Sequence, residues 1–278
     1  IIPYRLMAVF VQPDAWVQIE VLSGQLGDRY RMDAASGVVA SLTSRSWAWN
    51  APAAPGLYPL RITGALTGAV MTVQAFVLEP FPQQTTSLNG YRIGRYRTVA
   101  LDDNDAYRPP DGFVQITEAL QDVPVSPHFT LGQFLCKQTN TFPQYALVRT
   151  RLLIKLEMIL QALHEHGVDV PTLTIQSAFR TPYHNHAIGA GTTYSRHLYG
   201  DAADVYVDGD GDGRMDDLNE DGRLSRADAR VLAGLVRKVE DRLGIDAFVG
   251  GVGVYGPPHH RNAFVHVDTR GSRAAWSE

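Results

Sequence analysis

The sequence has one cysteine, Cys136, among its 278 residues, so no disulfide can form within the chain. We expect Cys136 to be a small core residue, because free cysteine is usually buried. No apolar stretch reaches the length of a transmembrane helix. Basic residues form no run and are not interleaved with aromatic ones, so nothing favours nucleic-acid binding. What remains is 45% hydrophobic and 19% charged, a composition typical of a soluble globular protein.

The first 80 residues predict a small all-β domain. Their apolar residues alternate with polar ones, turn residues recur at short intervals, and no helical period is present. The clearest alternating stretches are 15–21, 57–63 and 70–77. A β-sandwich is the natural interpretation of this pattern, and residues 47–58 resemble the late strands of an immunoglobulin-like domain. We expect Trp47 and Trp49 to pack in its core, with a sugar-binding platform as the alternative.

The rest of the chain predicts a mixed α+β domain over residues 125–278, joined to the first by a linker and wrapping segment over 81–124. Apolar residues recur at three- and four-residue steps over 147–166, and Gly167 stands where a C-cap glycine belongs. A second helix is predicted over 227–243 by the same criterion.

Two short stretches near the end of the chain carry zinc-binding side chains. Ser195–Asp204 reads Ser-Arg-His-Leu-Tyr-Gly-Asp-Ala-Ala-Asp, and Phe264–Asp268 reads Phe-Val-His-Val-Asp. Each includes or leads into a predicted strand, and two adjacent strands would present His197, Asp204 and His266 to a common point. Three such ligands leave the fourth tetrahedral position of zinc to water, as in catalytic sites. Because zinc lowers the pKa of bound water to about 7, we expect hydrolysis.

These motifs resemble the zinc D-alanyl-D-alanine carboxypeptidases and their murein endopeptidase relatives, which share a fold with the hedgehog signalling domain. The pattern Ser-x-His-x-x-Gly-x-Ala-x-Asp is complete at residues 195–204. Ser177-Ala-Phe-Arg-Thr-Pro-Tyr-His-Asn185 resembles a second block of the family, and the stretch from Gly250 to Trp276 a third. The resemblance covers residues 125–278. It implies a hedgehog/DD-peptidase-like antiparallel sheet with helices, zinc as cofactor and a peptidoglycan peptide as substrate.

The resemblance also implies a role for Arg180, whose guanidinium would stabilise the oxyanion or clamp a substrate carboxylate. A buried salt bridge is the alternative role. The chain departs from the family where many relatives carry the general base, because these positions hold Ala263 and Phe264. Asp268 is the first choice for the base, since it shares a strand face with His266. An equally open alternative is that Asp268 only orients a zinc-bound imidazole.

His259 and His260 are the next candidates for the base. If no base is present, the protein would be a non-catalytic zinc and calcium binding module, similar to the hedgehog domain, for cell-wall or surface partners. The same residues do not separate a carboxypeptidase from an endopeptidase, and the sequence gives no oligomeric state.

An acidic insert over residues 208–228 predicts calcium loops, because carboxylates alternate along it and glycine stands sixth. Two overlapping registers are present, and the second resembles the loops of dockerin-type repeats. The first comprises Asp208, Asp210, Asp212, the Arg214 carbonyl and Asp216. The second comprises Asp217, Asn219, Asp221, the Arg223 carbonyl, Ser225 and Asp228. We expect calcium to be structural and bound with modest affinity, as in extracellular modules.

The sequence therefore predicts a two-domain zinc metallopeptidase that hydrolyses peptidoglycan stem peptides or cross-links. Such a substrate, together with a calcium site of this kind, favours an extracytoplasmic location, periplasmic or secreted. The chain opens with Ile1-Ile2-Pro3, without Met or a signal-like segment. We expect this of a trimmed mature form, or of a chain cut at this point for another reason.

Overall fold

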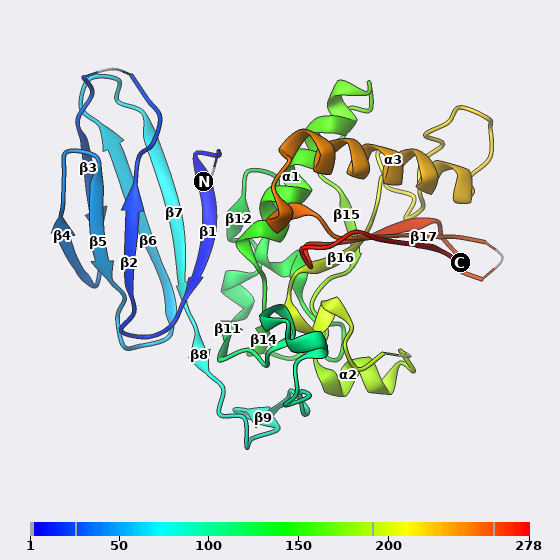
Figure 1. The fold of residues 1–278 in the computed structure, drawn as a ribbon, viewed down its shortest axis with the longest axis horizontal. Helices are drawn as coiled ribbons and strands as arrows, with labels where there is room; N and C mark the ends of the chain where they lie inside the picture. Colours follow the sequence, from blue (N-terminus) through cyan, green and yellow to red (C-terminus); the bar gives the residue numbers. More distant parts are fainter. Residues whose placement is uncertain (1–2, 26, 191, 258) are drawn as a thin grey trace.

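The structure, a computed structural model, describes residues 3–25, 27–190, 192–257 and 259–278, except the side chain of Asp103. Strands dominate the first part of the chain, and helices and a second main sheet form the rest (Figure 1). This mixed arrangement is compatible with the predicted α+β class. No helix within the described ranges has the length and apolar character needed to cross a membrane.

The first seven strands form two sheets that share one core. One sheet has the order β1-β7-β6-β3, with β1 parallel to β7, and the other has the order β2-β5-β4. Alternate residues point inward, so Trp49 from one sheet and Leu60 from the other are both fully buried. Trp47 is buried too, as the prediction of core packing requires. The bounds are β1 Leu6–Val11, β2 Trp16–Glu20, β3 Tyr30–Ala34, β4 Val38–Ser41, β5 Ser46–Asn50, β6 Gly56–Gly64 and β7 Val70–Val77.

The middle of the chain consists of short strands and 3₁₀ helices (η). Buried Phe81, Ile93 and Phe113 place this segment in the same hydrophobic core as the helices that follow. The bounds are β8 Glu79–Pro80, β9 Ser87–Leu88, β10 Tyr91–Arg92, η1 Leu101–Asp103, η2 Asp105–Tyr107, β11 Gly112–Ile116, η3 Glu118–Leu120, β12 Pro124–Ser126, β13 Phe129–Thr130, η4 Leu131–Phe134 and β14 Gln144–Ala146.

The last part of the chain contains the longest helices and a five-stranded sheet of order β15-β16-β18-β17-β19. All neighbours in this sheet are antiparallel except β17 and β19. The bounds are α1 Thr150–Glu165, β15 Thr174–Ser177, α2 Pro182–Ala187, η5 Arg196–Tyr199, β16 Ala202–Tyr206, α3 Arg226–Leu243, η6 Asp246–Phe248, β17 Gly251–Tyr255, β18 Phe264–Asp268 and β19 Ala274–Ser277.

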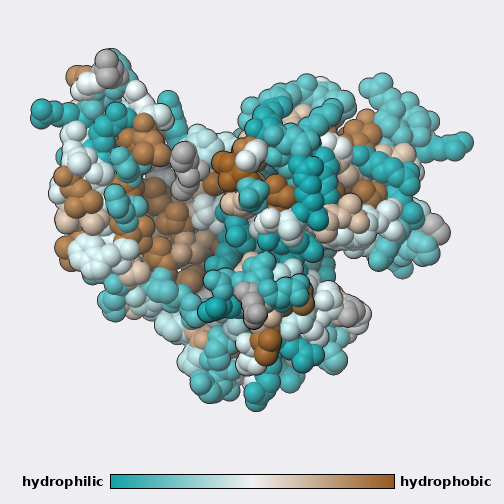
Figure 2. All heavy atoms as spheres, viewed as in Figure 1, coloured by the Kyte–Doolittle hydropathy of each residue, from teal (hydrophilic) through white to brown (hydrophobic). Residues whose placement is uncertain are grey.

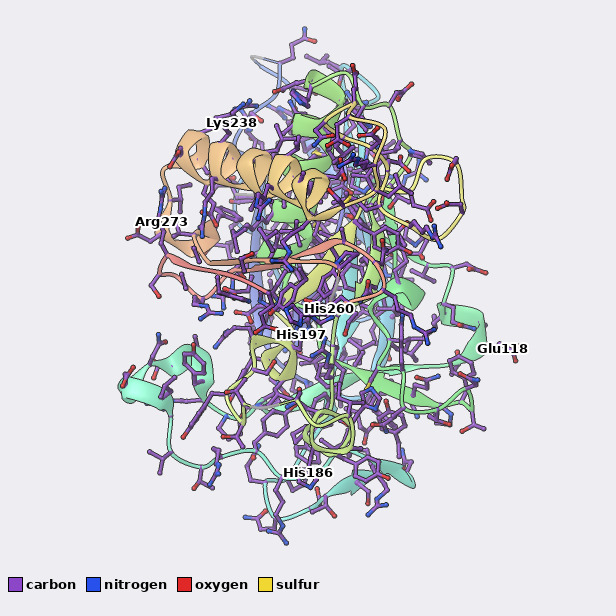
Figure 3. The ribbon with its side chains drawn as sticks, turned by 90° about the vertical axis from the view of Figure 1, so that its right-hand side faces the viewer. Glu118, His186, His197, Lys238, His260 and Arg273 are labelled. Atoms are coloured by element: carbon purple, nitrogen blue, oxygen red, sulfur yellow. The ribbon has the colours of Figure 1, made fainter. Side chains whose placement is uncertain are left out.

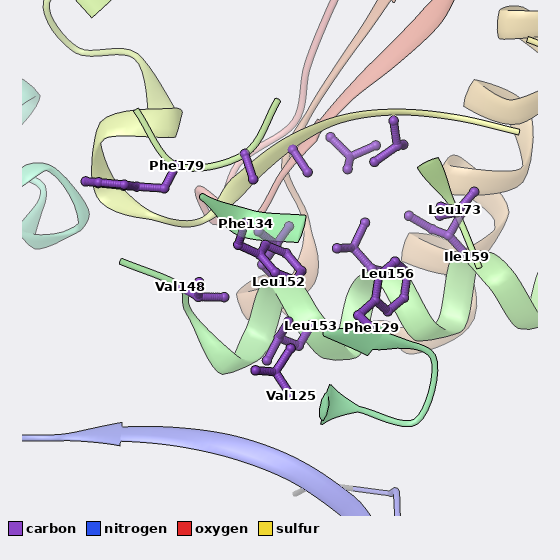
Figure 4. Close-up of a cluster of buried hydrophobic side chains, with 14 of the residues drawn as sticks. Val125, Phe129, Phe134, Val148, Leu152, Leu153, Leu156, Ile159, Leu173 and Phe179 are labelled. Atoms are coloured by element: carbon purple, nitrogen blue, oxygen red, sulfur yellow. The ribbon is translucent and has the colours of Figure 1, made fainter. Parts of the chain in front are cut away.

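Helices α1 and α3 share a core with one face of this sheet. Leu156 and Ile159 of α1 and Val236 of α3 belong to one buried cluster with Val205 and Val267 of the sheet. Figure 4 shows how Leu152, Leu156 and Ile159 of α1 lie among buried side chains of the preceding strands. Because the strand residues alternate, the polar residues between these valines point to the opposite face of the sheet.

The predicted helices are present with shifted starts. Helix α1 begins at Thr150 rather than Leu147, because the chain before it is held in another way: the Arg149 amide donates to the Gly200 carbonyl at 2.8 Å. Helix α3 begins at Arg226, where Ser225 and Asp228 form a capping box. Both helices therefore begin at residues set by their surroundings as well as by their own periodicity.

The first seven strands pack against the rest of the molecule through β1. Met7 and Ala8 of β1 belong to the core that contains α1, and the Thr150 hydroxyl donates to the Ala8 carbonyl at 2.9 Å. Figure 2 shows hydrophobic residues gathered in the hollow between these strands and the rest of the molecule. A largely apolar cavity of about 320 Å³ is lined by residues of β1, β2 and β7, among them Val9, Ile19 and Val73.

Candidate metal centre

The strand register brings two of the predicted ligands together. β16 and β18 are antiparallel neighbours, and Asp204 lies directly opposite His266. The residues next to them, Val205 and Val267, point into the core under the helices. Asp204 and His266 therefore share the other face of the sheet, where their side chains meet.

The third predicted ligand, His197, belongs to η5, the turn that precedes β16. Its Nδ1 lies 2.6 Å from the Ala178 carbonyl, and its own carbonyl accepts the Arg180 amide. A carbonyl can only accept, so Nδ1 carries the proton and Nε2 keeps a free lone pair. The segment after β15 thus fixes both the position and the tautomer of His197. Figure 3 shows where His197 lies, near the middle of the molecule.

Three donor atoms converge at this point. His197 Nε2 lies 3.2 Å from His266 Nδ1 and 3.2 Å from Asp204 Oδ1, and His266 Nδ1 lies 2.9 Å from Asp204 Oδ1. Ligands about 2.0–2.1 Å from a tetrahedral zinc ion lie about 3.3 Å from one another, so the triangle fits zinc. Among the residues that the structure describes, no fourth His, Cys, Asp or Glu side chain joins this group.

Asp268 lies on the side of His266 that faces away from the donor triangle. Its Oδ2 is 3.1 Å from His266 Nε2, while the metal-facing atom is Nδ1. The carboxylate also accepts the Gly251 amide at 2.9 Å and the Arg270 guanidinium, and it is fully buried. These contacts occupy both carboxylate oxygens. The geometry therefore favours the orienting role for Asp268 over that of general base.

Arg180 is bound to the ligand carboxylate. Its Nη2 donates to Asp204 Oδ2 at 2.6 Å and its Nε donates to the Ser177 hydroxyl at 2.8 Å. With Oδ2 bound to Arg180, Asp204 presents Oδ1 to the two imidazoles. The geometry favours the salt bridge for this guanidinium, which was the alternative to an oxyanion contact.

The electrostatics of the triangle suit a cation. Burial lowers the pKa of His197 against the opposing effect of Asp204, so this imidazole is neutral. Burial alone would raise the pKa of Asp204, but the two histidines hold it well below its ordinary value. Burial would lower the pKa of His266, yet its hydrogen bonds to Asp204 and Asp268 raise it to about 9. A metal ion at Nδ1 would take the place of that proton.

Aromatic side chains stand beside the triangle on the same face of the sheet. Gly253 lies opposite His266 and Tyr255 opposite Phe264, and Trp276 pairs with Gly253 from β19. The sequence analysis did not single out Tyr255 or Trp276. The sequence does hold a signal for large rings at this place: glycines at positions 251 and 253 alternate with valines and leave space above the strand. Burial raises the pKa of Tyr255, so its hydroxyl is protonated at neutral pH.

The loop between β17 and β18 carries the two other candidates for a base. The His260 ring packs edge-on against Tyr255 and Phe264, with centroids 5.1 Å and 5.3 Å away. His259, its neighbour, is exposed. Of the two, only His260 packs against the aromatic rings on the metal-facing side of the sheet.

The acidic insert brings together part of the first predicted calcium register. Donor atoms of Asp208, Asp210 and Asp216 lie within 4.8 Å of one another. Asp208 Oδ1 is buried and has no hydrogen-bond partner within the described ranges. Asp212 is not in this group, and its Oδ1 accepts the Arg214 amide at 2.8 Å.

The second register forms no comparable group within the part of the chain that the structure describes. Its side chains bind backbone amides instead. Asp217 accepts from Gly222 and Asp221, and the Asp221 carboxylate accepts from Arg223. Ser225 and Asp228 cap α3, and Asp228 also accepts the Asn219 amide.

Two imidazoles, one carboxylate and a free fourth position form the ligand set of a hydrolytic zinc centre. Residues 127–229 match the model of the family described as Peptidase M15. This segment contains Arg180, His197 and Asp204 and ends before His266. The match makes this segment similar to the M15 peptidases, a family of zinc-dependent enzymes. No curated protein and no solved structure gives a significant match to the chain.

Asp268→Asn tests the orienting contact. The change keeps the shape of the side chain but weakens its hold on His266 Nε2, so we expect zinc affinity to fall by about 10- to 100-fold. Competition with a chromophoric chelator measures this affinity. The exposed Asp169→Asn is the matched control and should bind zinc as the wild type does. Equal affinities in both variants would contradict the orienting role.

Proposed function

We propose that the protein is a zinc metallopeptidase that hydrolyses peptide bonds in peptidoglycan stem peptides or cross-links. The observation that carries the proposal is the triangle of His197 Nε2, Asp204 Oδ1 and His266 Nδ1, with no fourth protein ligand within the described residues. A closed structural site would need that fourth ligand. The family match supports the zinc peptidase class, and the resemblance of the motifs to murein peptidases supports the substrate.

The protein's own residues hold the centre and leave one side of it for a reaction. A zinc ion bound there would act as a Lewis acid and lower the pKa of a bound water to about 7. Ala178, Arg180 and Asp268 fix the orientation of the three ligands through the contacts described above. A peptide carbonyl placed against the open side would meet this water.

We further propose His260 as the general base, in place of Asp268. Both oxygens of Asp268 are engaged by other groups, whereas the His260 ring packs edge-on against Tyr255 and against Phe264, which lies two residues before His266 on the same strand face. An imidazole in this position would accept a proton from water and return it to the departing amine. Glu278 Oε2, 3.9 Å from His260 Nε2, lies near enough to influence the orientation of the ring.

The proposed substrate also implies a cellular location for the protein. Peptidoglycan lies outside the cytoplasm, so the protein would work in the periplasm or after secretion. The residues described here support both release of a terminal residue and internal cleavage.

A structural calcium ion in the first acidic register is a separate proposal. Three carboxylates meet at Asp208, Asp210 and Asp216, and one oxygen of Asp208 is buried without a partner. Burial raises the pKa of Asp216, and repulsion from Asp210, Asp208 and Asp212 adds to this effect. A calcium ion would neutralise this repulsion and hold the loop that leads from β16 to α3.

The first test is turnover of purified muropeptides by zinc-loaded protein, followed by mass spectrometry. We expect wild-type protein to release peptide fragments and His197→Ala to lose the activity, because a ligand is missing. His186→Ala, an exposed histidine on α2, is the control and should remain active. If the wild type binds muropeptides but forms no products, the result would contradict peptidase activity and support a non-catalytic binding module.

His260→Ala should lower kcat by about 100-fold or more, because general-base catalysis typically contributes 10²- to 10⁴-fold. His259→Ala, the neighbouring and exposed histidine, should change kcat by less than about threefold. Zinc affinity measured in parallel should be unchanged in both. A His260→Ala variant with wild-type kcat would rule out this residue as the base.

Removal of calcium with EGTA in the presence of excess zinc should lower the melting temperature by roughly 5 °C, since an ion at about 100 times its Kd adds about 2.7 kcal/mol to stability. Asp208→Asn should melt at the lower temperature with or without EGTA. Thermal melts followed by circular dichroism measure both. A melting temperature indifferent to EGTA would contradict a structural calcium.

A further inference from the structure

The metal-facing side of the sheet also carries a fixed aromatic group. Tyr255 and Phe264 stack with centroids 4.6 Å apart and planes 6° from parallel, and the Trp276 ring lies 5.2 Å from the His266 ring. Tyr255 and Trp276 are joined by a hydrogen bond of 2.6 Å from the indole Nε1 to the phenol oxygen. The tyrosine is therefore held by its ring and by its oxygen.

Gly253 makes this arrangement possible. It lies between His266 and Trp276 in the sheet, and a Cβ at this position would come 2.3 Å from Trp276 Nε1. Without a side chain there, the indole lies over the strand and its N–H reaches Tyr255. Any larger residue at 253 would displace the indole from this place.

The direction of this hydrogen bond leaves the tyrosine proton free. An indole N–H only donates, so the Tyr255 oxygen is the acceptor and its own O–H points elsewhere. Among the described residues, no side chain or carbonyl accepts that proton. A hydroxyl that is fixed, protonated and without an acceptor is suited to donate to a ligand.

The reaction calls for a donor of this kind, and the expected one has part of its guanidinium engaged elsewhere. Addition of water to a peptide carbonyl places negative charge on the carbonyl oxygen, and a fixed donor stabilises it. Arg180 was expected to serve, but its Nη2 and Nε are bound to Asp204 and Ser177. Tyr255 stands on the same face of the sheet as His266, two cross-strand pairs away.

We infer that Tyr255 is a catalytic residue of the proposed peptidase and donates a hydrogen bond to the oxygen of the scissile carbonyl, with Trp276 as its positioning residue. This inference rests on the proposed function. As the water oxygen bonds to the carbonyl carbon, the π electron pair moves onto the carbonyl oxygen, which accepts from Tyr255 without taking its proton. When this electron pair re-forms the carbonyl π bond, the C–N bond breaks, and the amine leaves with the proton that water gave up.

Tyr255→Phe tests the donor, because it removes one oxygen and keeps the stacked ring. The probe is a phosphinate analogue of an alanyl-alanine dipeptide, whose anionic tetrahedral centre resembles the charged intermediate. We expect Tyr255→Phe to weaken binding of this probe by about 10- to 100-fold and to lower kcat by about 100-fold, the size typical of one lost oxyanion donor. Zinc affinity and melting temperature should stay at wild-type values.

Tyr58→Phe is the matched control. It removes a hydroxyl that bonds to the Ala54 carbonyl in the first seven strands, far along the chain from the zinc residues. Probe binding and kcat should be unchanged in this variant. Loss of both in the control as well would overturn the assignment, since it would show that the effect does not belong to Tyr255.

Trp276→Phe separates a positioning role from a structural one. It should lower kcat by about 10-fold with little change in KM, and the Tyr255→Phe/Trp276→Phe double variant should be no slower than Tyr255→Phe alone. Additive losses would show that Trp276 does not act through the tyrosine.

The outcomes distinguish this inference from the proposed function. Wild-type protein that cleaves muropeptides, together with a Tyr255→Phe variant that binds the phosphinate and turns over normally, overturns the role of Tyr255 alone. Wild-type protein that neither cleaves muropeptides nor binds the phosphinate overturns the peptidase and, with it, this role.

Discussion

The pairing of β16 with β18 is the constraint on which the site depends. This pairing sets Asp204 opposite His266 and places the intervening valines in the core. A shift of β18 by one residue would turn His266 into the hydrophobic layer and away from Asp204, at a large cost in desolvation. The core under α1 and α3 therefore holds the metal ligands in register, and η5 has only to add His197 to a pair that is already formed.

Buried ionic contacts extend this support away from the sheet. The Lys155 ammonium in α1 is fully buried and bonds to Glu240 of α3 and to the carbonyl of Asp268. The Glu240 carboxylate also accepts the Gly250 amide, where β17 begins. Both helices thus hold the ends of the strands that carry the metal face. Arg196 and Asp201, paired and buried, do the same for η5 and the start of β16.

The sequence was most informative where a local pattern has one structural solution. The strands around Asp204 and His266, the two long helices and the meeting of the three ligand atoms all followed from periodicity and motif. Gly200 of the Ser-x-His-x-x-Gly pattern lies where the backbone passes close to Leu147, and a Cβ there would come 2.4 Å from the Leu147 carbonyl. A separate contact, the hydrogen bond from the Arg149 amide to the Gly200 carbonyl, holds the chain just before α1, whose start periodicity alone placed at Leu147.

Side-chain contacts that depend on the tertiary fold could not be predicted from the sequence. The guanidinium of Arg180 and the carboxylate of Asp268 have several possible partners, and only the packed structure shows that both serve the ligands. The segment from 81 to 124 has no clear period because its strands are two to five residues long and pair with distant neighbours, as β11 does with β14. Tyr255 and Trp276 lie 21 residues apart along the chain and meet only through β17 and β19.

A crystal structure of protein grown with zinc, with anomalous data collected on both sides of the zinc absorption edge, tests the central claim most directly. We expect one strong peak about 2.0–2.1 Å from His197 Nε2, Asp204 Oδ1 and His266 Nδ1, with solvent as the fourth neighbour. A peak elsewhere, or a fourth protein atom in place of solvent, would contradict a hydrolytic centre at this site.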